Sequence, residues 1–165
     1  MRKTAQLGLF LALALILSYV ESLIPFSFGV PGIKLGLPNL VVVLLLYRSG
    51  AKEAFLVNFL RVILSGFLFS NLYAILYALT GAVFSFCAML AGRRARCFSP
   101  VGVSVLGGVF HNIGQIIVAM LVVETFYVGS IVPVLIFAGT VTGAVLGVLA
   151  LELMPYLREA FPLGE

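Results

Sequence analysis

The sequence contains no tryptophan and no aspartate, one histidine, two cysteines and few charges of either sign. Charged residues make up 10% of the chain, whereas soluble domains carry about 25%. Hydrophobic residues make up 62%, which excludes a water-soluble globular domain. The missing aspartate argues against the aspartate-rich magnesium sites of enzymes that bind diphosphates. One histidine and two cysteines without a CxxC motif indicate no metal site, no bis-histidine haem and no disulfide.

Six apolar stretches follow one another along the 165 residues, and one membrane crossing takes about 20 residues. They predict an all-α integral membrane protein in which residues 1–165 form a single membrane domain. The predicted helices cover about residues 5–24, 35–47, 54–69, 72–91, 101–123 and 128–153. The second is short, and we expect it to be confined or partly non-helical near Pro38. A two-plus-four arrangement or a five-helix count is the structural alternative.

Positive charges fall on one side of the predicted membrane. Eight of the ten Lys and Arg residues lie before the first helix, in alternate loops or after the last helix: Arg2, Lys3, Arg48, Lys52, Arg93, Arg94, Arg96 and Arg158. The opposite loops carry only Lys34, and Arg61 lies within the third helix. Short basic loops stay in the cytoplasm, so both termini are predicted to be cytoplasmic. The first helix is interpreted as uncleaved, and the net charge of +4 as a topology signal without a nucleic-acid partner.

A few polar side chains are predicted at membrane depth, where a charge costs roughly 2.5 to 3.5 kcal/mol and usually faces the bundle interior. Asn58 and Arg61 share one face of the third helix. His111 and Gln115 share one face of the fifth, within the run HNIGQ. These and other polar residues could line one cavity open to the outside. The predicted ligand-binding residues are Lys34, Asn39, Asn58, Arg61, His111, Asn112 and Gln115, with Glu21 and Glu124 at the rim.

Each of these residues also has a structural interpretation. Backbone carbonyls or a carboxylate can satisfy Arg61, and interior hydrogen bonds can satisfy His111. Lys34 fits an ordinary loop charge, while Glu21 and Glu124 fit an interfacial position better than a catalytic one. No phosphate-binding loop, nucleophile elbow or zinc motif is present. No nucleophile, base and orienting residue can be assembled by spacing, so we predict that the chain is not an enzyme.

Small residues recur at four-residue spacing on several predicted helices, as in the row Gly139, Gly143 and Gly147 near the C-terminus. Such rows let helix backbones approach closely in lipid. Packing within the bundle is the structural interpretation. Docking of a partner membrane protein, through a row on the first helix, is the functional one, and the pattern does not distinguish the two.

Three motifs together resemble one family. They are GIKLGLPN from Gly32 to Asn39, the pair Leu60 and Arg61, and FHNIGQ from Phe110 to Gln115. The family is the small membrane family labelled Gx transporter or heptaprenyl diphosphate synthase component I, and the likeness covers nearly the whole chain. It is in turn similar to the S subunits of energy-coupling-factor transporters, which are six-helix bundles with an outward-facing ligand pocket. By that resemblance Gly8, Ala12 and Ala14 would dock a coupling membrane protein.

Three functions remain open. The first is a transport subunit in the bacterial cytoplasmic membrane that binds an anionic or amphipathic small ligand and depends on a separate energising protein. The second, implied by the resemblance, is a membrane component of flavin-based extracellular electron transfer, with a quinone or flavin as cofactor and a flavoprotein as partner. The third is a non-catalytic component I that assists a prenyl diphosphate synthase subunit. No cofactor is implied by the residues alone.

The predicted orientation puts the loop around Arg94 in the cytoplasm. We therefore expect a thiol in this loop, such as Cys97, to react with a membrane-impermeant maleimide only after the cells are opened. Labelling of this loop in intact cells would invert the orientation and would move the predicted cavity to the cytoplasmic face.

Overall fold

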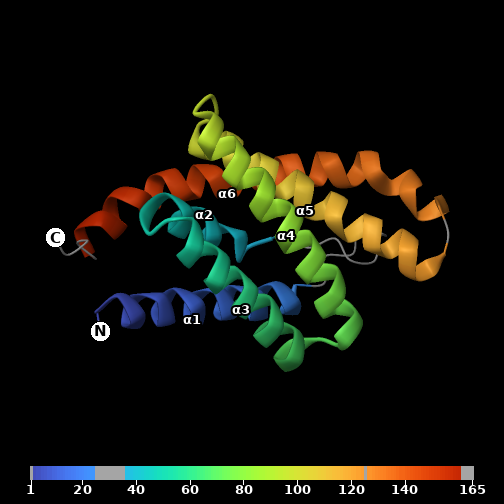
Figure 1. Ribbon diagram of the computed structural model, residues 1–165, viewed down its shortest axis with the longest axis horizontal. Coiled ribbons are helices and arrows are strands. Elements are labelled where there is room, and N and C mark those ends of the chain that lie inside the picture. Colours follow the sequence, from blue (N-terminus) through green and yellow to red (C-terminus); the bar gives the residue numbers. More distant parts are fainter. Residues whose placement is uncertain (1, 25–35, 125, 161–165) are drawn as a thin grey trace.

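Helices account for all the regular structure in residues 2–24, 36–124 and 126–160, the residues described in this computed structural model (Figure 1). This confirms the predicted all-α class. The elements are α1 (Arg2–Leu23), α2 (Asn39–Arg48), α3 (Ala51–Phe69), α4 (Leu72–Ala95), α5 (Pro100–Val123), the 3-10 segment η1 (Phe126–Ile131) and α6 (Val132–Ala160).

Four helical segments are long and apolar enough to cross a membrane, which fits the membrane protein predicted from composition: Lys3–Leu23, Leu72–Ala95, Pro100–Val122 and Gly129–Leu157. α3 has 19 residues, but Lys52, Glu53 and Arg61 interrupt its apolar character. α2 has 10 residues. At a rise of about 1.5 Å per residue it is roughly 15 Å long, half of a hydrocarbon core of about 30 Å.

The short helix α2 lies in the core of the bundle. Its residues 41–46, with the sequence VVVLLL, are each at most 3% exposed. A helix that is apolar on every side is stable only where all its sides are covered. α1, α3, α5 and α6 provide that cover.

α2 begins at Asn39 and not near residue 35, where the sequence predicted its start. Gly36 has φ +73°, a left-handed conformation that a helix cannot include and that glycine adopts without steric cost. Pro38 follows with φ −64° and lies at the position that caps the helix. Because proline has no N–H to donate, it is tolerated where a helix begins. Residues 36–38 therefore form a turn before α2, as expected near Pro38.

α5 and α6 approach one another at glycines. A Cβ atom on Gly108 would lie 2.3 Å from the carbonyl oxygen of Gly139, and one on Gly143 would lie 2.7 Å from Cα of Val105. Van der Waals contact between backbones is a main source of helix association in lipid, where apolar burial contributes little. The small-residue row of α6 therefore serves packing within the bundle.

α1 lies at the edge of the bundle, and the predicted docking residues do not share one face of it. Gly8 and Ala12 are exposed, and a Cβ on Gly8 would meet nothing within 4 Å. Ala14 is 1% exposed and belongs to the core. With 3.6 residues per turn, Ala12 lies about 40° around the helix from Gly8 and Ala14 about 240°. Any docking surface on α1 is thus limited to Gly8, Ala12 and their neighbours.

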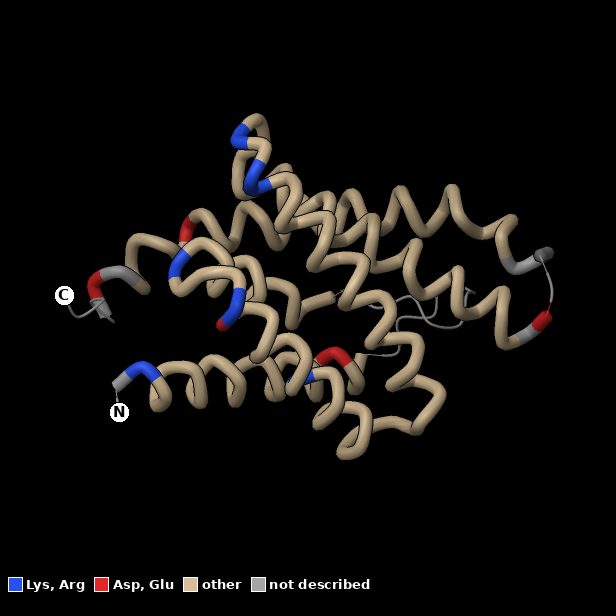
Figure 2. Tube along the Cα trace, in the orientation of Figure 1, with Lys and Arg blue, Asp and Glu red and all other residues tan. Residues whose placement is uncertain are grey.

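An ion pair joins the start of α1 to the start of α3. Lys3 Nζ donates to a carboxylate oxygen of Glu53. This hydrogen bond is the main reason why the pKa of Glu53 lies below its usual value. The Lys and Arg residues that are described lie mainly in the half of the molecule that holds both ends of the chain (Figure 2).

Substitution by alanine of one closely packed glycine, Gly108, and one exposed glycine, Gly8, tests the packing of α5 on α6. Gly108→Ala adds a methyl group against the backbone of α6, and we expect a loss of about 1 to 3 kcal/mol in unfolding free energy. Gly8→Ala is the matched control and should be neutral or slightly stabilising, because alanine is more favourable than glycine inside a helix by about 1 kcal/mol. Thermal unfolding in detergent measures both. Equal stability of the two variants would contradict the packing of Gly108 on Gly139.

Candidate functional site

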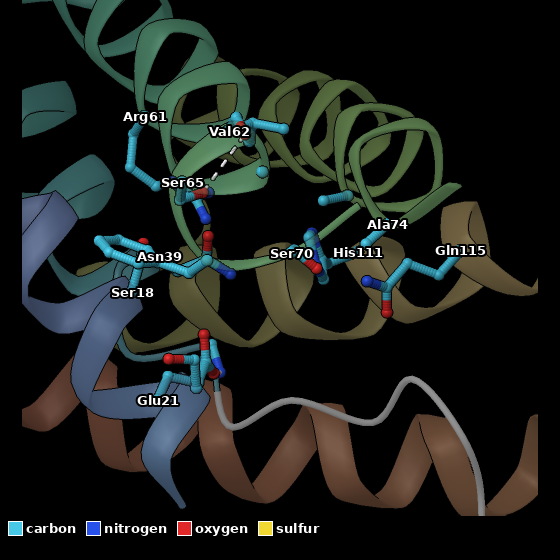
Figure 3. A pocket seen from close by; sticks show the side chains of 15 residues that line it. Ser18, Glu21, Asn39, Arg61, Val62, Ser65, Ser70, Ala74, His111 and Gln115 are labelled. Atoms are coloured by element: carbon cyan, nitrogen blue, oxygen red, sulfur yellow. Dashed lines mark hydrogen bonds between the residues drawn. The ribbon is translucent and has the colours of Figure 1, made fainter. Parts of the chain in front are cut away.

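A polar cavity of about 40 Å³ lies where α1, α3, α4 and α5 meet the start of α2 (Figure 3). It brings together five of the nine residues that the sequence predicted for the ligand site and its rim: Glu21, Asn39, Arg61, His111 and Gln115. Serine hydroxyls supply further polar lining, from Ser18, Ser22, Ser65 and Ser70. The cavity therefore draws on residues separated by almost a hundred positions in the chain.

The cavity lies near the middle of α3 and α5, which supply Arg61 and His111. Arg61 follows the first residue of α3 by ten positions, and His111 follows the first residue of α5 by eleven. At a rise of about 1.5 Å per residue, both lie roughly 15 Å along their helices. Asn39, the first residue of α2, lies beside them. The half-length helix α2 thus starts at the cavity.

Among the described residues that line the cavity, Arg61 is the only lysine or arginine, and it is 7% exposed. Its Nη2 donates a hydrogen bond of 2.6 Å to Oδ1 of Asn58, which is one turn earlier in α3 and 2% exposed. Its Nε is buried and has no hydrogen-bond partner among the described residues. A guanidinium has five N–H donors, and buried donors normally have acceptors. Arg61 therefore has donor capacity left over in the cavity.

Glu21 provides the opposite charge. Its carboxylate interacts electrostatically with Arg61 and also accepts a hydrogen bond from the backbone N–H of Gly36. The N-terminal end of a helix carries partial positive charge, so a carboxylate is stabilised near the start of α2. Arg61, Asn39 and Glu21, from α3, α2 and α1, point toward one another across the cavity (Figure 3). Glu21, predicted at the rim, is part of the cavity wall.

His111 and Gln115 form the α5 side of the cavity, as their four-residue spacing predicted. The His111 ring packs against Gly81 of α4, where a Cβ would lie 2.9 Å from its Cε1 atom. Glycine at position 81 is thus needed for the ring to occupy this place. His111 and Asn39 also line a smaller space of about 10 Å³ toward α6.

The remaining predicted residues lie elsewhere. Asn112 does not line the main cavity; its Nδ2 donates a 2.8 Å hydrogen bond to the carbonyl oxygen of Leu135 in α6. Consecutive helical residues are about 100° apart, so His111 and Asn112 face different neighbours. Asn58 supports Arg61 from outside the lining, and Glu124 is exposed where α5 ends. Lys34 lies outside the described residues.

None of the four lining serines was among the predicted site residues, and Ser18 and Ser70 show why. Ser18 precedes Glu21 by three positions and therefore shares its helical face, a spacing that could have identified it. Ser70 joins α3 to α4 after an apolar run. No local pattern marks Ser70, because only the turn between these two helices brings it to the cavity.

The sequence model of the family described as heptaprenyl diphosphate synthase component I matches residues 10–153 of the 165. The chain belongs to this family. The match confirms the family predicted from the three motifs, and the matched range includes all the cavity residues. Comparisons with curated proteins and with solved structures found no match. The description of the heptaprenyl diphosphate synthase component I family is consistent with an accessory, non-catalytic subunit.

The hydrogen bond between Asn58 and Arg61 can be tested through stability. Asn58→Ala removes the acceptor of Arg61 Nη2 and leaves a charged donor buried, so we expect a loss of about 1.5 to 3 kcal/mol in unfolding free energy. The same substitution in an Arg61→Leu background should cost much less, since no charge is left unsatisfied. Chemical unfolding in detergent gives all four values. Additive effects would show that Asn58 does not act through Arg61.

Proposed function

We propose that the protein is a membrane subunit that binds the anionic end of a small ligand at Arg61 and catalyses no reaction itself. The observation that supports this is the buried Nε of Arg61, a donor at a polar cavity that has no acceptor among the described residues. Carboxylate and phosphate oxygens form short, strong hydrogen bonds with guanidinium groups. Asn39, His111 and Gln115 add polar groups that can orient the rest of the ligand.

The size of the cavity limits what it holds in this conformation. A space of about 40 Å³ admits roughly three water molecules, whereas sites for drug-sized ligands measure about 300 to 1,000 Å³. A whole ligand therefore enters only if lining helices separate. α1 is less buried than the lining helices α4 and α5: 11% of its apolar stretch is buried inside the molecule, against 33% in α4 and 28% in α5. Outward movement of α1 would break the hydrogen bond between Glu21 and Gly36.

The proposed subunit crosses the bacterial cytoplasmic membrane six times, with both termini in the cytoplasm. Basic residues gathered toward one end of the molecule support this orientation (Figure 2). In such an arrangement α2 would be the inner part of the second crossing, and the cavity at its start would face outward. The exposed Gly8 and Ala12 on α1 leave room for close approach of a coupling membrane protein, as in the S subunits of energy-coupling-factor transporters.

A second candidate function is supported by the family description, which names a component of a prenyl diphosphate synthase. In this role the protein would bring a prenyl synthase subunit to the membrane. The loop that follows α4, with Arg96 at its start and Arg94 in the last helical turn before it, offers exposed charge for that contact. Co-purification with the synthase subunit that depends on this loop, and not on Arg61 or His111, would favour it.

The ligand itself is the first thing to measure. Protein purified in mild detergent should release an anionic small molecule on extraction, detected by mass spectrometry, and should show no absorbing cofactor. Arg61→Ala should reduce the retained amount at least tenfold and Arg61→Lys less, because lysine keeps the charge but not the planar set of donors. Lys52→Ala, at an exposed position of the same helix, is the matched control. A stoichiometric quinone or flavin would instead favour the electron-transfer function.

Complementation tests the same residues in the cell. In a deletion strain, the Arg61→Ala and His111→Ala variants should fail to restore function although they are inserted in the membrane at normal amounts. The Glu124→Gln variant should restore function, because Glu124 lies outside the cavity lining. Membrane fractionation provides the control for insertion. Full complementation by both cavity variants would give Arg61 and His111 a purely structural role.

A further inference from the structure

A second hollow on the molecule is apolar and lies between α4 and α5. It has a volume of about 590 Å³, and all its lining residues are hydrophobic, glycine or cysteine. It shares no lining residue with the polar cavity around Arg61. Both helices are long and apolar enough to cross a membrane, so the groove would face lipid.

The shape of the groove follows from residue size. Ala88, Ala91 and Ala95 recur at three- and four-residue spacing and place a strip of small side chains along α4. Phe98 and Phe110 stand at its sides and remain 45% and 38% exposed. The small residues form the floor of a channel and the two aromatic residues form its sides. The channel is apolar along its length and open to the bilayer, which suits a hydrocarbon chain.

Positive charge is placed where this groove ends. Arg94 and Arg96 flank Ala95 and are both exposed, and neither forms an ion pair with any residue that the structure describes. Arg93 differs from them, because its guanidinium lies 5.3 Å from the centre of the Tyr47 ring on α2. Two unpaired guanidinium groups beside an apolar channel complement a molecule that has a hydrocarbon chain and an anionic head.

We propose that the groove between α4 and α5 binds an anionic phospholipid of the surrounding leaflet, with one acyl chain along Ala88, Ala91 and Ala95 and its phosphate group at Arg94 and Arg96. Guanidinium groups form charge-assisted hydrogen bonds with phosphate oxygens. Basic pockets between membrane helices on the cytoplasmic side bind anionic lipid heads in this way. Zwitterionic lipids of the same chain length can fill the channel but add a second, positive group to the head.

Native mass spectrometry of the full chain tests selection by the head group. The protein is incubated in detergent with equal amounts of phosphatidylglycerol and phosphatidylcholine that carry identical chains. We expect one phosphatidylglycerol to be retained in preference, and Arg94→Gln or Arg96→Gln to lower that preference about fivefold each. Lys52→Gln, another exposed basic residue, is the matched control and should leave the preference unchanged. Equal retention of the two lipids by the unmodified protein would overturn the proposal.

Cys87 allows the position of the chain to be tested, since it is exposed and lines the groove. In a Cys97→Ser protein, alkylation of Cys87 by N-phenylmaleimide should be slowed severalfold by phosphatidylglycerol, and Ala91→Leu should abolish this protection by filling the channel. Ala12→Leu, at an exposed alanine of α1, is the control for added bulk. Phosphatidylglycerol selection without protection of Cys87 would place the lipid elsewhere and overturn the groove assignment. Retention of a prenyl diphosphate in place of the phospholipid would also overturn the proposal.

Discussion

The buried guanidinium of Arg61 is the constraint on which the centre of this bundle depends. A charge that is 7% exposed inside an apolar bundle must have polar groups around it, and they come from several helices. Asn58 accepts one hydrogen bond, and Glu21 supplies the opposite charge from α1. Glu21 in turn accepts from Gly36, which holds the turn before α2 in place. The position of α1 against α2 is thus coupled to the charge on α3.

The same constraint explains how a helix of 10 residues comes to lie in the core. A helix that starts inside the bundle leaves backbone N–H groups without helical partners, and these must be satisfied locally. Asn39 N donates to Gly36 O at 2.8 Å, and Gly36 N donates to Glu21. Polar backbone, Glu21 and Arg61 therefore gather at one point because each would be costly to bury alone. These polar groups line the cavity.

The two binding functions proposed for the molecule rest on two different sites. The polar cavity has room for a few waters and contains a guanidinium donor that has no acceptor in the part of the chain that the structure describes, which suits the anionic end of a ligand. The apolar groove between α4 and α5 is larger and ends at exposed arginines. Close packing at Gly108 and Gly139 keeps α5 against α6. α5 contributes His111 to the polar cavity and, together with α4, forms the apolar groove.

Composition and spacing along single helices were enough to predict the all-α class, the membrane-like apolar helices and the helical faces that carry Arg61, His111 and Gln115. The family was predicted by the resemblance of three short motifs. The sequence did not reveal that Asn112 bonds to α6, that Ala14 belongs to the core, or that Ser70 reaches the cavity. Spacing along a helix shows which residues share a face, but not which neighbour that face meets. Tertiary packing decided this, since glycine contacts and the buried charge set how the helices are placed together.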